Sequence, residues 1–312
     1  MGRTKHIIVG SRGDASSLIY RARVRAALTE AHPNAEFVDA PDGQSRDERA
    51  RQAPRKLEAR RAAAVLQRLV KGEIDVAVID ARWIPLQIAA PLEIAAIVAR
   101  TNPFDALVSH ESLILDEQPE NTCVAVNDPV KRGQLLYYRS DLRFVDGDDD
   151  FGSLFDAINR GAIDAFVFPA SDIEMLNQQE HVVEVFTTSI CTPVAGQGAL
   201  ALVGRRDRKD VFSMLRDMND RSAAMEVEIE RMFLESVAKD AKAPVGVLAN
   251  VEENEFEIEA AIVAFDGSEK ISGIMSGALG DRSRIVEKLA NELLASGGEE
   301  IVASFRKLRG NG

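Results

Sequence analysis

The chain has 312 residues, of which 46% are hydrophobic and 28% are charged, and its formal net charge is -12. This length allows two or three domains with apolar cores. The negative charge argues against nucleic acids and anionic membranes as partners, because both are recognised by basic surfaces. An anionic ligand would need a local cationic pocket to overcome the overall field.

The first hundred residues alternate strand and helix patterns. Strands are expected at 6–9, 36–39 and 74–79, and helices at 16–31 and 57–70. The polar stretch 41–55 has the composition of a mobile loop. This alternation predicts an α/β lobe with a mainly parallel sheet and helices on both faces.

A second unit of the same kind follows residue 100. Its expected strands are 123–126, 142–145, 164–168 and 182–189, and its expected helices are 130–138 and 152–159. Asp128 and Pro129 predict the start of the first of these helices, as an N-cap followed by an early proline. Two such lobes would leave a cleft between them, where sheets of this class bind ligands.

The last portion has a different pattern. It predicts a helix at 225–237, antiparallel strands at 246–249, 255–265 and 270–276, and a final helix at 282–296. We therefore expect an α/β fold with two doubly wound lobes, like those of periplasmic binding proteins, around a cleft. Lobe 1 would comprise 1–99 with 195–217, lobe 2 would comprise 100–194, and a small C-terminal α+β domain would comprise 218–312.

The two cysteines, Cys123 and Cys191, lie far apart in apolar, strand-like segments. Such a context favours buried free thiols over a disulfide or a metal site. The sequence also contains no apolar run long enough to span a bilayer and no signal-peptide pattern at its start. A cytoplasmic location is therefore expected.

Four stretches, in chain order, match the pattern of one enzyme family. They are V-G-S-R-G-D at 9–14, G-E-I-D-V-A-V at 72–78, N-P-F-D-A-L-V-S at 102–109 and P-V-A-G-Q-G-A-L-A-L at 193–202. With L-A-N-E-L-L-A-S-G-G-E-E-I at 289–301, the chain resembles porphobilinogen deaminase, also called hydroxymethylbilane synthase, over nearly its whole length. The resemblance implies a three-domain fold and a role in pyrrole or tetrapyrrole metabolism.

Members of that family assemble four pyrroles on a dipyrromethane cofactor, which a cysteine holds through a thioether. In K-D-A-K-A-P-V-G at 239–246, the resemblance places Ala241 at the position of that cysteine. Since a methyl group cannot form the bond, the sequence predicts that the chain carries no dipyrromethane. The flanking Lys239 and Lys242 have two interpretations, a covalent adduct with an electrophilic pyrrole or solvated loop lysines.

The family's catalytic aspartate handles protons at the pyrrole nitrogens and at the leaving amine. Here the segment reads I-D-A-R-W-I-P at 79–85, and Pro85 sets the register that puts Trp83 at the aspartate position. An indole only donates hydrogen bonds, so it cannot replace a carboxylate base. Asp80 is the one possible catalytic residue, provided that its side chain faces the cleft. Trp83 has two interpretations, stacking on a planar ring or filling core volume.

The resemblance also implies a row of arginines for the acetate and propionate groups of the pyrroles. Arg12 is kept and Arg82 replaces a lysine, whereas the family's paired arginines become Val130 and Lys131, or Lys131 and Arg132 after a one-residue slip. The predicted ligand-binding residues are Arg12, Asp14, Arg82, Trp83, Asn127, Lys131, Arg132 and Gln197. The expected ligand is a small planar or anionic molecule in the cleft between the lobes.

The family's Arg-Gly-Asn loop becomes the acidic run Asp148, Asp149 and Asp150. Clustered carboxylates on a turn suit a divalent cation, but the run lacks the last glutamate of a calcium loop. Either a weak cation site or a solvated acidic loop is consistent with it. No metal is predicted from the rest of the sequence, because the four histidines lack ligand-like spacing.

Three functions remain open at this point. The first is a divergent family member that cannot attach dipyrromethane and has an altered reaction or a regulatory role. The second is a non-catalytic two-lobe protein that binds a small ligand. The third is an active hydroxymethylbilane synthase with relocated catalytic groups. Nothing in the sequence identifies a protein partner.

Overall fold

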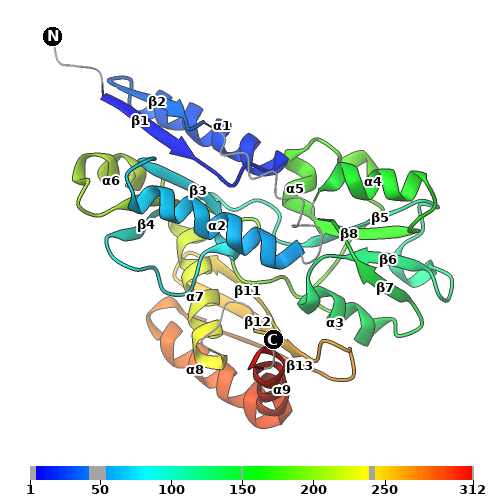
Figure 1. Cartoon of the computed structure of the whole chain (residues 1–312). Coiled ribbons are helices and arrows are strands. Elements are labelled where there is room, and N and C mark those ends of the chain that lie inside the picture. Colours follow the sequence, from blue (N-terminus) through cyan, green and yellow to red (C-terminus); the bar gives the residue numbers. More distant parts are fainter. Residues whose placement is uncertain (1–4, 42–53, 149, 239–242, 311–312) are drawn as a thin grey trace. The chain divides into compact units, whose positions relative to one another are not determined.

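The computed structural model describes residues 5–41, 54–148, 150–238 and 243–310. The chain divides into two compact units, Met1–Thr101 with Ala199–Ala224 and Asn102–Gly198 with Met225–Gly312. The first unit holds one five-stranded sheet, and the second holds a five-stranded and a three-stranded sheet (Figure 1). The predicted α/β fold class is confirmed. The separation of the second unit into a lobe and a C-terminal domain stays a prediction.

The sheet of the first unit has the strand order β2-β1-β3-β10-β4. β1 (Lys5–Gly10) lies between β2 (Ala35–Asp39) and β3 (Val76–Asp80) and is parallel to both. β10 (Leu200–Arg205) is antiparallel to β3 and to β4 (Leu92–Val98). The helices of this unit are α1 (Ala15–Ala31), α2 (Pro54–Val70) and α6 (Lys209–Arg216).

The five-stranded sheet of the second unit has the order β7-β6-β8-β5-β9. Its strands are β5 (Asp105–Ser109), β6 (Cys123–Val126), β7 (Arg143–Asp146), β8 (Ala165–Pro169) and β9 (Glu184–Val185). Its helices are α3 (Pro129–Tyr138), α4 (Phe151–Asn159) and α5 (Ala170–Met175). In this lobe too, one central strand is reversed, because β5 is antiparallel to β8. Each of the two sheets therefore has one reversed strand among strands that run in a single direction, and the prediction of mainly parallel sheets is confirmed.

Side-chain alternation along β8 separates the two apolar cores of this lobe. Phe166 and Phe168 belong to the core that includes Phe151 of α4, whereas Val167 belongs to the core that includes Leu135 of α3. This is the two-residue period of a strand that is buried on both faces. Cys123 and Cys191 are free and buried, one in each core, as the sequence predicted.

The C-terminal part contains α7 (Arg221–Val237) and a three-stranded antiparallel sheet of β11 (Val245–Glu252), β12 (Glu255–Val263) and β13 (Lys270–Ala278). Gly267 has φ +71°, which fits the predicted turn between β12 and β13. α8 (Arg282–Leu293) ends before Gly297, which has φ +117°. A further helix, α9 (Glu299–Gly310), follows and was not predicted.

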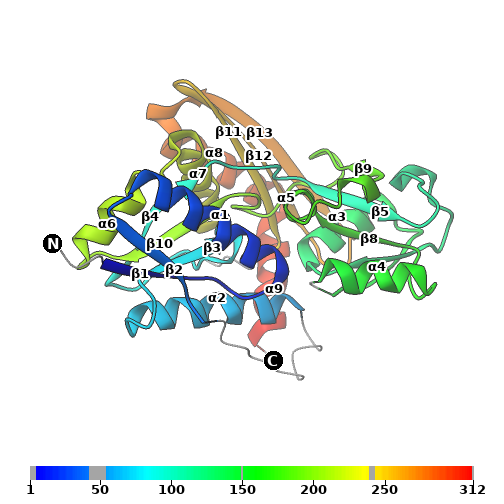
Figure 2. The ribbon, with the colours of Figure 1, turned by 90° about the horizontal axis from the view of Figure 1, so that it is seen from above.

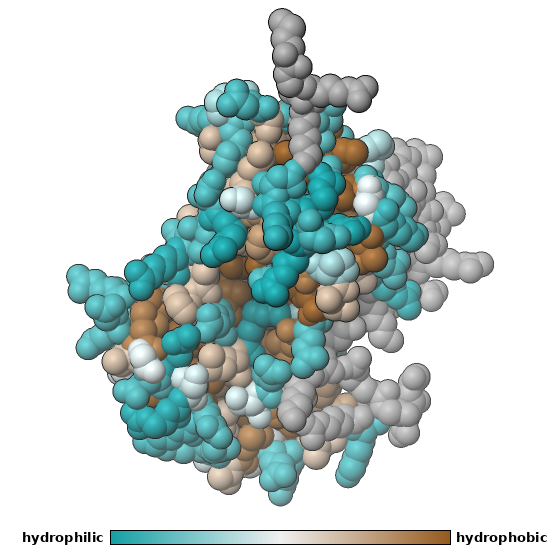
Figure 3. Space-filling model, turned by 90° about the vertical axis from the view of Figure 1, so that its left-hand side faces the viewer, coloured by the Kyte–Doolittle hydropathy of each residue, from teal (hydrophilic) through white to brown (hydrophobic). Residues whose placement is uncertain are grey.

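Other differences from the sequence-based expectations are small. The predicted strand at 182–189 is reduced to the two residues of β9, and the elements β4, β5, β10, α5 and α6 were not predicted. Most of the predicted loop at 41–55 lies outside the described residues, and α2 already begins at Pro54. Within the described ranges, no helix is long and apolar enough to cross a membrane. The face in Figure 3 is largely hydrophilic, with apolar residues in separate small areas.

Candidate functional site

Two neighbouring strands of the first unit carry five of the predicted site residues. Arg12 and Asp14 follow β1, whereas Asp80 is the last residue of β3 and Arg82 and Trp83 come directly after it. Since β1 and β3 are parallel and adjacent, their carboxyl ends lie at the same edge of the sheet. Arg12, Asp14, Asp80, Arg82 and Trp83 are called the Trp83 group below.

Asp14 caps the first turn of α1. Its carboxylate accepts hydrogen bonds from the Ser17 amide at 3.0 Å and the Ser16 hydroxyl at 3.0 Å, and from Nη2 of Arg12 at 3.3 Å. Burial by itself would raise the pKa of Asp14, but the charge of Arg12 and the bonds from Ser17 and Ser16 outweigh it and keep that pKa below its usual value. Asp14 is therefore an ionised anchor for Arg12 at neutral pH.

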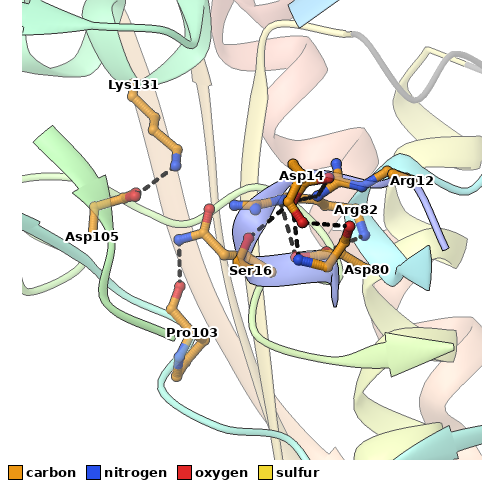
Figure 4. Close-up of polar contacts among 10 residues, drawn as sticks. Arg12, Asp14, Ser16, Asp80, Arg82, Pro103, Asp105 and Lys131 are labelled. Atoms are coloured by element: carbon orange, nitrogen blue, oxygen red, sulfur yellow. Dashed lines mark hydrogen bonds and ion pairs between the residues drawn. The ribbon is translucent and has the colours of Figure 1, made fainter. Parts of the chain in front are cut away.

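Asp80 plays a similar part for Arg82. The chain turns after β3 into a short 3-10 helix (Ala81–Trp83), and Oδ1 of Asp80 accepts from the Arg82 amide at 3.0 Å. Its Oδ2 lies 3.1 Å from Nε of Arg82, and the two side chains are 4% and 8% exposed. Figure 4 shows these residues beside Arg12, Asp14 and Ser16. Both oxygens of Asp80 thus contact Arg82, which weighs against Asp80 as a carrier of protons to a ligand.

Trp83 connects the two arginines. The guanidinium carbons of Arg12 and Arg82 lie 5.8 Å and 5.4 Å from the centre of the indole ring, within the range of cation-π attraction. The indole Nε1 is buried, and the described residues offer it no hydrogen-bond partner. The side chain as a whole is half-buried. The arrangement gives a flat ring next to two oriented cations, with no carboxylate at position 83.

Two predicted ligand-binding residues of the second unit, Lys131 and Gln197, make buried contacts inside that unit instead. Nζ of Lys131 lies 2.5 Å from Oδ1 of Asp105, and these side chains are 3% and 0% exposed (Figure 4). Gln197 is fully buried, and its side-chain amide donates to the Pro103 carbonyl at 2.7 Å. The charge of Lys131 is therefore matched within the fold. The sequence analysis did not recognise Asp105 as its partner, although N-P-F-D-A-L-V-S contains it.

The remaining predicted ligand-binding residues lie near α3. Asn127 is half-buried directly after β6. Arg132 is partly exposed, and its Nη1 lies 3.3 Å from Oδ1 of Asp146, which is 85% exposed.

The acidic run before α4 has a structural use. Asp150 is the N-cap of α4 and accepts from the Ser153 amide at 2.8 Å, while Asp148 accepts from the Asp150 amide at 3.2 Å. Asp149 lies outside the described residues. The part of the chain that the structure describes contains no group of three His, Cys, Asp or Glu that could hold a metal ion.

The two thiols are poor candidates for a covalent attachment. Burial raises the pKa of Cys191 well above its usual value, and Asp105, whose Oδ2 lies 3.9 Å from the sulfur, raises it further. Burial also raises the pKa of Cys123. A buried thiol with a raised pKa offers little thiolate for bond formation. The segment with Lys239, Ala241 and Lys242 lies outside the described residues.

One buried carboxylate was missed by the sequence analysis. Glu230 on α7 is fully buried and accepts from the Gly196 amide at 2.6 Å and the Ala249 amide at 3.0 Å. It holds the loop before β10 and the strand β11 against the helix. Its position among the apolar residues of α7 was the available signal, because an ionisable side chain there must find partners.

Comparisons with known proteins agree with the resemblance. Residues 7–213 match the family model described as "Porphobilinogen deaminase, dipyromethane cofactor binding domain". The porphobilinogen deaminase of Pelotomaculum thermopropionicum is 30% identical over 77% of this chain and 77% of its own length. That of Roseiflexus sp. is 28% identical over 95% of this chain and 98% of its own.

Solved structures give weaker matches. The aliphatic sulphonate binding protein SsuA from Escherichia coli has a TM-score of 0.38 and 16% identity, over 69% of this chain and 70% of its own. A TRAP periplasmic solute binding protein from Desulfovibrio salexigens has a TM-score of 0.45 and 10% identity, over 70% and 73%. Likeness of this extent carries no argument about a ligand.

The family match corrects the prediction that the chain carries no dipyrromethane. The matched domain is the one that binds this cofactor, and it spans residues 7–213. The prediction was wrong because it rested on the single residue Ala241, which lies outside that span, and took no account of the rest of the binding surface. Within the span, Arg12, Arg82 and Trp83 offer cations and a flat ring, which suit a planar group with carboxylates. The matched span and the relatives together show that this chain belongs to the porphobilinogen deaminase family.

Proposed function

We propose that the Trp83 group binds carboxylated pyrroles, and that the reaction on them differs from that of hydroxymethylbilane synthase at the proton-transfer step. One observation carries this proposal. An indole, with the guanidinium groups of Arg12 and Arg82 at 5.8 Å and 5.4 Å, stands where the family resemblance places the catalytic aspartate.

Binding follows from the chemistry of the group. The half-buried indole of Trp83 offers a face on which a planar pyrrole can stack, and the two guanidinium groups can accept its carboxylates as ion pairs. Asp80 holds the Arg82 side chain through a contact of 3.1 Å, and Asp14 holds the Arg12 side chain through one of 3.3 Å. Because the cations are already oriented, less side-chain entropy is lost when the ligand binds.

Dipyrromethane is itself a carboxylated dipyrrole, and the same residues would hold it. Arg12 and Arg82 would meet its carboxylates and Trp83 would meet a ring. When bound, this cofactor supplies the terminal pyrrole to which further pyrroles are added.

The altered reaction follows from what the group lacks. Release of ammonia from porphobilinogen requires a proton for the leaving amine, and Trp83 can neither store nor return one near neutral pH. Asp80 is 4% exposed and both of its oxygens contact Arg82. A chain that binds the pyrrole and transfers protons poorly could serve a different reaction on it, or sense its concentration.

The test is single-turnover release of ammonia from porphobilinogen by three forms of the protein. We expect the wild type to be slow and Trp83→Asp to be faster by about 100-fold or more, the usual contribution of a placed general acid or base. Trp83→Asn is the matched control, because it changes the size in the same way without adding a titratable group, and it should stay slow.

Two outcomes would contradict the altered reaction. One is a fast wild type that Trp83→Asp slows. The other is a fast wild type that loses its rate in Asp80→Asn, which would assign proton transfer to Asp80 and make the chain an active synthase with a relocated carboxylate. Saturable binding without any ammonia release, in the wild type and in Trp83→Asp alike, would instead support a non-catalytic binding protein.

A further inference from the structure

The second unit contains a pocket at the end of its five-stranded sheet where the parallel strands β6 and β8 begin. The pocket is formed by residues of 109–122 and of 158–164, next to the last residue of the antiparallel β5. Figure 2 shows β5, β8 and α4 beside one another in this part of the unit. The volume is about 620 Å³, within the range of small-molecule sites. It is called the β8 pocket below.

The lining of the β8 pocket is acidic. Glu111, Glu120 and Asp164 contribute three carboxylates, and the lining contains no lysine and no arginine. Within the described ranges of the chain, none of these carboxylates forms an ion pair, and the exposed Arg143 and Arg160 on adjoining segments pair with none of them. Carboxylates gathered around one hollow give it a negative potential that attracts a cationic ligand.

The fold holds two polar groups of the lining in place. Oδ2 of Asp164 accepts from the Cys123 amide at 2.7 Å, which orients that carboxylate. Gln118 is 5% exposed, and its Nε2 donates to the Ser109 hydroxyl at 3.0 Å and to the Leu113 carbonyl at 2.6 Å. No described residue donates to Oε1 of Gln118. The pocket therefore offers a preoriented acceptor on a buried side chain, which a hydrogen-bond donor on a ligand would satisfy.

The buried part of the lining is apolar. Ile158 and Ile163 are 4% and 8% exposed and belong to the core that α4 covers. Ile158 also lies in the last turn of α4, and Gly161 follows directly after that helix. A helix carries partial negative charge at its C-terminus, which again favours a cation. The pocket thus combines an apolar base with acceptors and negative charge around it.

We propose that the β8 pocket binds a free aliphatic polyamine, an unbranched chain of methylene groups that carries two or more ammonium groups. The ammonium groups would donate to the three carboxylates and to Oε1 of Gln118, and the methylene groups would lie on the two isoleucines. His110, which also lines the pocket, can accept a further hydrogen bond when its imidazole is neutral.

Other small ligands fit this lining less well. A bare metal ion is disfavoured, because the described residues contain no group of three His, Cys, Asp or Glu that could hold one. A carboxylated pyrrole would meet carboxylates of its own sign. The pocket and the Trp83 group belong to different units of the chain, so the two sites can be tested separately.

Calorimetric titration of the full chain with spermidine tests the proposal. We expect saturable binding at one site in the wild type. Glu120→Gln removes one carboxylate from the pocket and no ion pair, so the melting temperature should not change while the Kd rises by about tenfold. Glu117→Gln is the matched control, because Glu117 is also exposed and lies three residues away but does not line the pocket. This variant should bind spermidine like the wild type.

Hydrogen exchange supplies a second measurement, which locates the ligand. Spermidine should slow the exchange of amides within 109–122 and 158–164 in the wild type and in Glu117→Gln, and should do so at a higher concentration in Glu120→Gln. Magnesium chloride at the same ionic strength should not slow exchange at these amides.

Four results would overturn the proposal. A wild type that takes up no spermidine is the first. A titration that never saturates, or an equal loss of affinity in the two variants, would mean diffuse attraction of a cation to a chain of net charge -12. Magnesium that displaces spermidine at equal concentration would assign the pocket to a metal ion. Binding of a lysine-rich peptide that depends on Glu120, without binding of spermidine, would assign it to a protein partner.

Discussion

The Trp83 group of the first unit and the buried charges Lys131 and Glu230 of the second differ in the sequence distance that their contacts bridge. In the Trp83 group, Arg12 pairs with Asp14 and Arg82 with Asp80, each two residues away. In the second unit, Lys131 pairs with Asp105 across 26 residues, and Glu230 reaches Gly196 across 34. Long-range buried contacts hold elements together, whereas pairs within one turn only orient their own side chains. The contacts of Lys131 and Glu230 therefore connect separate elements, whereas the printed pairs of Arg12 and Arg82 lie within single turns.

The largest expected effect is on the buried pair. Lys131→Met would leave the carboxylate of Asp105 at 0% exposure without its cation, which should cost about 3–5 kcal/mol of unfolding free energy. Arg132→Met is the matched control on the same helix, because its partner Asp146 is 85% exposed, and it should cost less than about 1 kcal/mol. Urea denaturation measures both. Equal losses for the two variants would mean that the buried pair does not hold the unit together.

A smaller effect is expected in the Trp83 group. Asp14→Asn keeps the helix cap and removes the charge beside Arg12, so the loss at neutral pH should be on the order of 1 kcal/mol. The pKa of Asp14 is lowered in the folded protein. Its contribution should therefore be complete above the unfolded-state pKa of about 3.9 and disappear as the pH falls through the lower folded value.

Urea denaturation of the wild type and Asp14→Asn across the acid range checks this sign. The gap between the two proteins should close as the pH decreases. A gap that stays constant, or widens in acid, would mean that the carboxylate of Asp14 is not stabilised by its charge.

Local signals in the sequence predicted the parts of the fold that local geometry decides. Asp128 and Pro129 marked the start of α3, and Gly267 marked the turn between β12 and β13. Strand direction is not local, so the reversed β5 and β10 within otherwise parallel sheets could not be foreseen. α9 was missed because Gly297 was interpreted as the end of all helix, whereas Glu299 and Glu300 supply the acidic first turn of another.

The candidate site was predictable to a similar extent. That Arg12 and Trp83 would be neighbours follows from the parallel pairing of β1 and β3 together with the family pattern. The pairing of Asp80 with Arg82 depends on the short 3-10 turn, which no periodicity indicates. The burial of Lys131 depends on its ion pair with Asp105, which lies far away in the sequence and comes close only in the folded sheet.

Binding of porphobilinogen, followed through the fluorescence of Trp83, tests the central claim most directly, since Trp83 is the only tryptophan in the chain. Arg82→Met should weaken binding by about tenfold, the worth of one charge-assisted contact. Arg205→Met is the matched control, because Arg205 pairs with Asp207 in the same unit with the same two-residue spacing, and it should bind like the wild type. A saturable change in wild-type fluorescence that Arg82→Met weakens is the predicted result. Fluorescence that does not respond to porphobilinogen, with no binding by calorimetry, would contradict the account.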